Sequence, residues 1–315
     1  MRIIIDQGIP FLEGVFGPGI TALHLPPEEI TPETVREADA LFVRTRTRID
    51  RKLLEGSKVR FVATATIGFD HIDQAYCQEA GIHWISCPGC NAQAVCDYVE
   101  EAISSMKSDK TELTVGIVGY GHVGKLVAQM AERKGYKTLI SDPPLGIGET
   151  LQAIAPLCDV LTFHTPLTHK GGHPTHHLCD ANILRLCQPN TLIINAARGG
   201  VIDEEALCDI LEEDGKLSTA IDCWEGEPEV NKKLLNMVDL ASFHIAGYSI
   251  QGKMRASEMC LYAFCEFFSL PILSINKKVV PLHGDSEKGW LLRLTEQLKA
   301  APEHFEQLRK QYKLR

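Results

Sequence analysis

The sequence lacks the features that mark membrane, secreted and nucleic-acid-binding proteins. Across its 315 residues, no uninterrupted apolar run reaches the length of about 20 residues that a bilayer-spanning helix needs. The first residues, MRIIID, begin a strand pattern directly and contain no signal-peptide core. Acidic residues outnumber basic ones by 41 to 32 and no long basic run occurs, so neither nucleic acid nor an anionic membrane is an expected partner. We therefore expect a cytoplasmic protein that holds any anionic ligand with individually placed arginines.

The eleven cysteines are an odd number, they are scattered, and several lie inside apolar runs. Without a secretion signal, this pattern is typical of reduced thiols packed as small apolar residues. Cys87 and Cys90 form a Cys-X-X-Cys pair, which could belong to a redox site or to half of a zinc site. A matching second pair is missing and the enclosed Pro-Gly is typical of a turn, so we predict neither use.

One segment is rich in histidine and could supply metal ligands. It contains His164, His169, His173, His176 and His177. No acidic residue is interleaved in an HExxH pattern, and the glycines and proline of the segment are typical of a flexible loop. We therefore predict no metal site.

The most informative stretch runs from Leu113 to Asp142. An apolar strand pattern is followed by the turn GYGHVG, a helical pattern, a second apolar strand and an aspartate, which is the order of a dinucleotide site. The first glycine permits a tight turn, the second lets the backbone approach a pyrophosphate, and the third lets the helix pack close to the strand. Free amides and the dipole at the start of the helix favour phosphates. The contacts predicted here are Gly119, Gly121, His122, Val123, Gly124 and Asp142.

Asp142 decides between the two nicotinamide cofactors. It lies 18 residues after Gly124, where a carboxylate can accept hydrogen bonds from a ribose diol. Its negative charge would repel a 2′-phosphate. The predicted cofactor is therefore NAD rather than NADP.

Apolar strands alternate with polar or helical segments along most of the chain, a pattern typical of α/β folds with parallel sheets. We predict two Rossmann-like, doubly wound parallel-sheet domains with a cleft between them. Residues 1–93 and 251–270 form a substrate-binding domain that acts as a lid, and residues 94–250 form the NAD-binding domain. Residues 271–315 form a short C-terminal extension.

Three chargeable residues each follow an apolar segment of the predicted NAD-binding domain. They are Arg198, Glu227 and His244. Because parallel strands bring such ends together at one edge of a sheet, the three side chains could meet beside the nicotinamide. Their types fit alcohol oxidation: a histidine accepts the hydroxyl proton, a carboxylate orients the imidazole, and an arginine holds a substrate carboxylate. Taken singly, the histidine could be an ordinary core residue and the glutamate a turn residue.

Longer motifs within residues 1 to about 260 resemble those of the D-isomer-specific 2-hydroxyacid dehydrogenases. They are FVATATIGFDHID at 61–73, PGCNA at 88–92, LTFHTPL at 161–167, DCWEGEP at 222–228 and HIAGY at 244–248. The resemblance implies that Arg198, Glu227 and His244 are catalytic, with His244 as the proton acceptor. It further implies NAD contacts by Thr165, Ala196, Ala197, Asp222 and Gly247, and substrate contacts by Thr45, Thr66 and Tyr248.

Within this family the motifs are most similar to the branch that oxidises a phosphorylated hydroxy acid. Arg44, Arg46 and Arg48 alternate directly after the predicted strand Ala40–Val43, a position that favours an anion contact over a merely solvated face. We predict that Arg44, Arg46 or Arg255 supplies charge for the substrate phosphate. The alternatives are a relative acting on phosphoglycerate, hydroxypyruvate or glyoxylate, and a non-enzymatic NAD sensor that binds protein partners. A homodimer paired through the nucleotide domain is left open.

Overall fold

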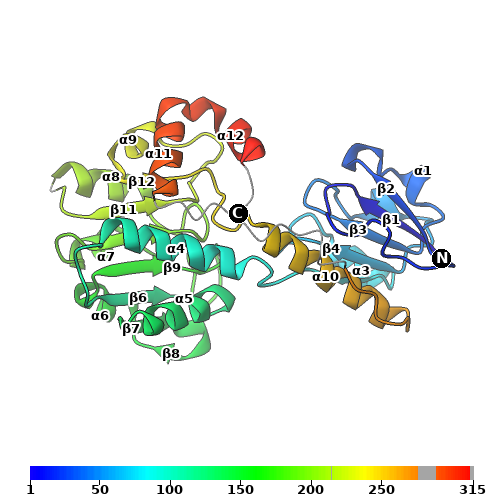
Figure 1. Cartoon of the computed structure of the whole chain (residues 1–315), viewed down its shortest axis with the longest axis horizontal. Coiled ribbons are helices and arrows are strands. Elements are labelled where there is room, and N and C mark those ends of the chain that lie inside the picture. The colour runs from blue at the N-terminus through cyan, green and yellow to red at the C-terminus, as the bar shows by residue number, and fades with distance from the viewer. Residues whose placement is uncertain (214, 276–288, 313–315) are drawn as a thin grey trace. The chain divides into compact units, whose positions relative to one another are not determined.

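The computed structural model describes residues 1–213, 215–275 and 289–312, which divide into two compact units (Figure 1). Among the described residues, the first unit combines 1–91 with 249–275, and the second combines 92–213, 215–248 and 289–312. Each unit is built on its own sheet of mainly parallel strands. The predicted α/β fold with two Rossmann-like domains is confirmed.

In the first unit the described strands form a five-stranded parallel sheet in the order β2-β1-β3-β4-β5. This is a doubly wound order, in which ligands bind outside the carboxyl ends of the strands. The bounds are β1 (Arg2–Asp6), β2 (Thr21–Leu25), β3 (Ala40–Val43), β4 (Phe61–Thr64), β5 (His83–Ile85), α1 (Pro32–Val35), α2 (Arg51–Leu54), α3 (Gln74–Glu79) and α10 (Ile250–Phe267).

The central strands of the first unit are buried on both faces because their residues are almost all apolar. Successive side chains point to opposite faces. On one face Ile3 and Phe42 pack with Phe264 of α10, and on the other face Ile4 packs with Leu41. The edge strand β2 is not among the predicted strands, since its residues are only partly buried and form no apolar run.

In the second unit the described strands form a seven-stranded sheet in the order β12-β11-β10-β9-β6-β7-β8, parallel except for β8. The strand order reverses between β6 and β9, and a dinucleotide binds at such a switch point. The strands are β6 (Thr114–Val118), β7 (Lys137–Asp142), β8 (Ile147–Gly148), β9 (Val160–Phe163), β10 (Leu192–Asn195), β11 (Ser218–Ile221) and β12 (Leu240–Ala241).

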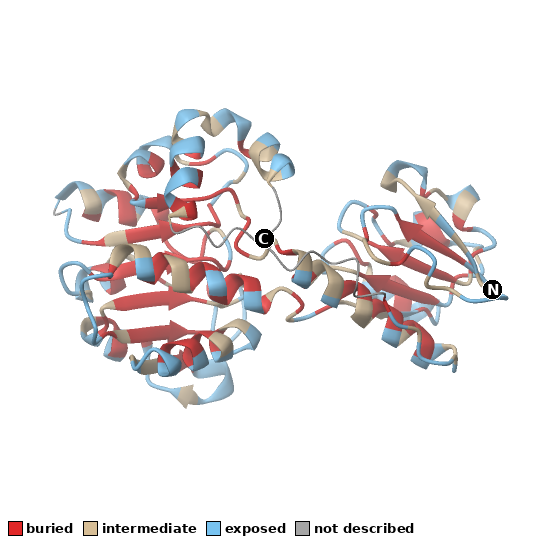
Figure 2. Ribbon diagram, in the orientation of Figure 1, coloured by how far each residue is buried: buried red, intermediate tan, exposed pale blue. Residues whose placement is uncertain are grey.

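Helices flank this sheet, and buried residues gather in the strands and on the inner faces of the helices (Figure 2). Neighbouring helices pack as α4 with α5, as α7 with α8, and as α8 with α9. They are α4 (Ala92–Met106), α5 (His122–Arg133), α6 (Leu151–Ile154), α7 (Ala181–Leu186), α8 (Glu204–Glu213), α9 (Lys232–Met237), α11 (Trp290–Ala300) and α12 (Phe305–Gln311). Short 3-10 helices lie at Pro27–Glu29 (η1), Pro143–Leu145 (η2), Ala155–Leu157 (η3) and Pro302–His304 (η5).

Residues 289–312 of the predicted C-terminal extension are packed into the second unit, whereas 271–275 belong to the first unit. Leu291, Leu298 and Phe305 are buried in the same apolar cluster as the sheet, and α11 lies against β12. The apolar faces of α11 and α12 therefore complete the core of the second unit. Within the described ranges, no helix combines the length and the apolar character that a bilayer crossing requires.

Candidate active site

The glycine turn after β6 has three positions with different steric demands. Gly119 has φ +93°, and a Cβ on it would lie 2.8 Å from the carbonyl oxygen of His164. A Cβ on Gly124 would lie 2.0 Å from the carbonyl oxygen of Gly119, so only glycine lets α5 start this close to β6. A Cβ on Gly121 would meet no described atom within 4 Å. No packing within the described protein therefore demands a glycine here, and the close approach to a pyrophosphate stays its predicted role.

These contacts predict opposite behaviour for two alanine variants. We expect Gly121→Ala to leave the thermal midpoint unchanged and to weaken NAD binding about tenfold, equivalent to about 1.4 kcal/mol. We expect Gly124→Ala to lower the free energy of unfolding by about 1–3 kcal/mol, because the added methyl group forces the helix away from the strand. Thermal melts and NAD titrations of both variants check this. Equal destabilisation by the two substitutions would contradict it.

A pocket of about 680 Å³ opens beside this turn, at the switch point of the sheet. Gly119, Gly121, Asp142 and Thr165 line it, so four of the predicted cofactor contacts share one cavity. Among the described residues, Thr165 Oγ1 and His164 Nδ1 are buried polar atoms without a hydrogen-bond partner. A hydroxyl and a ring nitrogen left unpaired at the wall of a pocket fit a polar ligand such as a dinucleotide.

Asp142 stands at the end of β7 and already orders the loops around the pocket. Its Oδ2 accepts from the backbone N–H of Tyr120 at 2.7 Å and its Oδ1 from that of Leu145 at 3.2 Å. A carboxylate has about four acceptor positions, so capacity remains for the ribose diol that the sequence analysis assigns to it.

His164 follows β9 and is held neutral by burial. Burial lowers the pKa of its imidazole from 6.5 to about 3, and Nε2 lies 3.1 Å from Thr162 Oγ1. Because the folded pKa is below the unfolded one, the unfolded chain binds more protons as the pH falls from about 6.5 toward 3. This histidine then makes the protein less stable at lower pH.

We expect His164 to contribute about 2 kcal/mol to the loss of stability between pH 7 and pH 5. The variant His164→Gln has no titrating imidazole and should show a correspondingly smaller loss. Urea unfolding of both proteins at the two pH values measures the difference. Identical losses would show that the imidazole is not desolvated in the folded protein.

A second cavity, of about 290 Å³, brings together the three predicted catalytic residues. Arg198, Glu227 and His244 all line it. Glu227 Oε1 and His244 Nδ1 are hydrogen-bonded, and the Arg198 guanidinium donates to the carbonyl of Ala197 at 2.7 Å. They come from the segments after β10, β11 and β12, which are consecutive strands of the sheet. The pairing leaves Nε2 of His244 as the ring nitrogen that can exchange a proton with a ligand.

Asp222 holds the turn that carries His244. This carboxylate is 1% exposed and accepts from the backbone N–H groups of Ile245 and Ala246 at 2.8 and 2.9 Å. It also accepts from Ser242 Oγ at 2.6 Å, and its own carbonyl accepts from His244 N at 2.9 Å. His244 has φ +57°, an uncommon conformation for a non-glycine residue. These bonds fix that conformation, a role that the predicted NAD contact of Asp222 does not include.

Arg198 lies on a turn that is stabilised by Asn195, a residue not predicted to belong to the site. The side-chain amide of Asn195 donates to the carbonyls of Arg198 and Cys223 at 2.9 and 3.1 Å. A Cβ on Gly199 would lie 1.9 Å from the carbonyl oxygen of Trp224, so the turns after β10 and β11 are in close contact. Ala196 and Ala197 are buried beside this turn, and Gly247 is half-buried.

Glu227 is kept ionised by its neighbours. Burial raises the pKa of this carboxyl, whereas the hydrogen bond and charge of His244 and the backbone N–H of Trp224 lower it, and the net result is a pKa below its ordinary value. Arg309 adds to the same effect. Its guanidinium lies 5.4 Å from the ring centroid of Tyr248, a predicted substrate contact. Arg309 belongs to α12, where no motif marks it, so its place near the site could not be found from the sequence.

The predicted substrate residues of the first unit lie in loops after β3 and β4. Thr45 and Arg46 are exposed. Arg44 is half-buried and donates to the carbonyl of Gly8 at 3.3 Å. The hydroxyl of Thr66 donates to the carbonyl of Gly68 at 2.9 Å. Their contacts with a substrate stay predictions.

Lys253 joins Arg44 in the first unit. Burial and the positive charge of Arg44 lower the pKa of this ammonium group. Two positive charges that act on each other in this way favour an anion as a ligand near them. Arg255, also on α10, is exposed. Nothing in the spacing of Lys253 and Arg44 along the sequence predicts that their charges interact.

Comparison with known proteins places the chain in a family. Residues 93–246 match the model of the D-isomer specific 2-hydroxyacid dehydrogenase, NAD binding domain. An erythronate-4-phosphate dehydrogenase of Bacteroides thetaiotaomicron is 42% identical over 100% of this chain and 97% of its own length. The chain belongs to the D-isomer-specific 2-hydroxyacid dehydrogenases. It is thus an oxidoreductase whose second unit is an NAD-binding domain.

A second relative is similar over most of the chain, and a solved structure shares the fold. The erythronate-4-phosphate dehydrogenase of Marinobacter nauticus is 44% identical over 86% of this chain and 74% of its own length. The NAD+-bound 3-phosphoglycerate dehydrogenase of Entamoeba histolytica has a TM-score of 0.70, covers 88% of this chain and 99% of its own, and is 24% identical. At 24% identity, the similarity to this 3-phosphoglycerate dehydrogenase shows the fold alone.

Proposed function

We propose that this dehydrogenase oxidises 4-phospho-D-erythronate with NAD to (R)-3-hydroxy-2-oxo-4-phosphooxybutanoate, a step of pyridoxal 5′-phosphate biosynthesis. The names of relatives about 40% identical over the whole chain support this substrate. The observation that carries the chemistry is the hydrogen-bonded pair of His244 and Glu227 in one cavity with Arg198.

The chemistry that bound NAD would supply is the acceptor for the hydride that leaves the carbon bearing the hydroxyl group. His244 takes the hydroxyl proton at Nε2 while Nδ1 stays bonded to Glu227. The ionised Glu227 orients the imidazole and stabilises its charged form. Arg198 binds the substrate carboxylate and polarises the reacting oxygen. Gly119, Gly121, Asp142 and Thr165 hold the cofactor in the neighbouring pocket.

The phosphate of the substrate is assigned to the cationic pair Arg44 and Lys253. Their proximity, and the desolvation of Lys253, support an anion contact. We expect Lys253→Met to raise KM for phosphoerythronate about 30-fold or more, because removing one partner of a charge pair costs about 2 kcal/mol or more. Lys52→Met, which removes an exposed lysine of α2, should leave KM unchanged. Equal KM values for both variants and the wild type would rule out the assignment.

A substrate panel tests the proposed function as a whole. NADH absorbance is followed with phosphoerythronate, phosphoglycerate, hydroxypyruvate and glyoxylate, the last two assayed in the reducing direction. The proposal predicts the highest kcat/KM for phosphoerythronate. A higher value for another acid would assign the chain to that reaction. NAD binding without turnover of any of them would favour the non-enzymatic sensor. A homodimer stays a prediction.

A further inference from the structure

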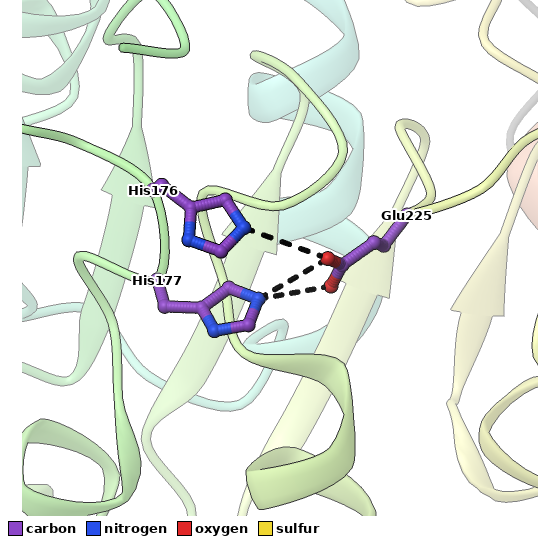
Figure 3. A group of neighbouring side chains, drawn as sticks. All are labelled: His176, His177 and Glu225. Atoms are coloured by element: carbon purple, nitrogen blue, oxygen red, sulfur yellow. Dashed lines mark hydrogen bonds and ion pairs between the residues drawn. The ribbon is translucent and has the colours of Figure 1, made fainter. Parts of the chain in front are cut away.

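We propose that His176, His177 and Glu225 form a Zn²⁺ site at the rim of the catalytic cavity. The two imidazoles belong to the segment between β9 and α7, and the carboxylate belongs to the turn after β11 (Figure 3). Their candidate ligand atoms all lie within 4.8 Å of one another. Two imidazoles and one carboxylate are ligands that zinc prefers, and three protein ligands leave a fourth position open.

The separations come close to those of a metal site. Two ligands of a tetrahedral zinc, each about 2.1 Å from the metal, are about 3.4 Å apart. His177 Nε2 lies 3.1 Å from Glu225 Oε2, and His176 Nε2 lies 3.7 Å from Glu225 Oε1. Figure 3 shows both rings directed at the same carboxylate. To bind one ion together, the three ligand atoms, which now lie within 4.8 Å of one another, have to close to about 3.4 Å, a movement that rotation of these partly exposed side chains can supply.

The surroundings hold these side chains in place without a metal. Asp203 Oδ2 lies 3.5 Å from Nδ1 of His177, where it favours the tautomer that leaves Nε2 free for a metal. The backbone of His177 has φ +52° and donates to the carbonyl of Gly200 at 2.7 Å. Such a conformation in a non-glycine residue is uncommon and is often found at functional sites. The backbone N–H of Glu225 is held by Glu204 Oε1 at 2.7 Å.

The site is open to ions and is independent of the thiols. The side chains of His176, His177 and Glu225 are 36%, 33% and 42% exposed, so an ion can reach them from solvent. The cysteines are buried except for the half-buried Cys187. The prediction of no metal rested on spacing within the histidine segment. It is revised here because the third ligand lies 48 residues beyond His177 and meets it only in the folded chain.

Zinc at this site inhibits the dehydrogenase. His176 and Glu225 line the same cavity as Arg198, Glu227 and His244, so a metal ion and its water take space beside the reacting groups. This consequence rests on the proposed function, whereas zinc binding does not.

The test is a zinc titration of untagged, chelator-treated protein in competition with a chromophoric chelator. We expect one tight equivalent for the wild type, and more than about 100-fold weaker binding for His177→Gln, since an outer partner alone is worth about 10–100-fold. Asp203→Asn should weaken binding by that smaller factor. His304→Gln is the matched control. His304 Nε2 lies 3.7 Å from Glu303 Oε1, and the described residues give this pair no third ligand. Its zinc affinity should equal that of the wild type.

Cobalt supplies a second readout that does not depend on activity. Co²⁺ at the site should give visible ligand-field bands without a thiolate charge-transfer band. A thiolate band, no tight equivalent in the wild type, or wild-type affinity in His177→Gln would overturn the site. If circular dichroism of the metal-free protein shows His177→Gln to be misfolded, the zinc affinities of His176→Gln and Asp203→Asn are used in its place. Wild-type affinity in both of these variants would then overturn the site.

The inhibition is tested by the zinc concentration that halves the rate, with each protein compared with its own metal-free rate. Asp203→Asn should shift this concentration by the same factor as it shifts the binding constant. An unshifted value would overturn the inhibitory role. Absence of turnover in the metal-free wild type would refute the proposed function instead and would leave the binding isotherm intact.

Discussion

Replacing His244 by glutamine should lower kcat by about 10²–10⁴-fold, the usual contribution of a positioned general base. Glutamine has a similar reach, and its amide can still donate to Glu227 in place of the Nδ1–H group. It has no nitrogen that accepts a proton near neutral pH. The loss should therefore fall on kcat, while the dissociation constant of NAD, which is set in the neighbouring pocket, stays close to that of the wild type. Initial rates of NADH formation and an NAD titration measure both quantities.

His83→Gln is a suitable control for His244→Gln. His83 is an exposed histidine of β5 in the first unit, so its replacement removes an imidazole without touching the cavity. Its kcat should be that of the wild type. A value of kcat for His244→Gln within tenfold of the wild type would show that another group removes the hydroxyl proton. The catalytic role assigned to His244 and Glu227 would then be wrong.

The parts of the site that could be predicted from the sequence are those set by a single turn or by the ends of parallel strands. Gly119, Gly121 and Gly124 lie within six residues, and the conformation of one turn fixes what each must do. Arg198, Glu227 and His244 lie far apart in the chain, but each follows a strand. Since the carboxyl ends of parallel strands share one edge, their convergence follows from the alternation of strands and helices.

The remaining features depend on which loops touch, and no spacing in the sequence encodes that. Arg309 reaches the neighbourhood of Glu227 because α12 packs on the second unit, and Lys253 meets Arg44 because α10 returns to the first. Glu225 meets two histidines from a different loop. The position of Arg309 depends on the apolar faces of helices that complete the core of the second unit. Sequence motifs do not indicate packing of this kind.

Asp222 has a structural role in addition to the cofactor contact that is predicted for it. The family motif marks it as a contact of the cofactor. Its carboxylate, however, accepts two backbone N–H groups of the His244 turn and the hydroxyl of Ser242, and it is almost fully buried. An ionised acceptor of this kind makes hydrogen bonds about twice as strong as neutral ones. Asp222 is therefore a positioning residue for His244 whether or not it also contacts NAD.

Replacing Asp222 by asparagine should consequently damage stability and catalysis together. One carboxylate oxygen becomes an NH₂ group that faces donors, so at least one buried N–H loses its acceptor. We expect the free energy of unfolding to fall by about 3 kcal/mol. The His244 turn should relax, and a displacement of about 1 Å there lowers kcat by about 100-fold. Urea unfolding and steady-state rates give the two numbers.

Two further variants separate positioning from cofactor contact. Ser242→Ala removes one of the bonds to Asp222 and should cost about 1 kcal/mol, with a smaller loss of kcat. Asp209→Asn makes the same chemical change at an exposed position of α8 and should alter neither quantity. If Asp222→Asn instead weakened NAD binding and left the stability at the wild-type value, Asp222 would serve the cofactor. The conformation of His244 would then have to be maintained by the rest of its turn.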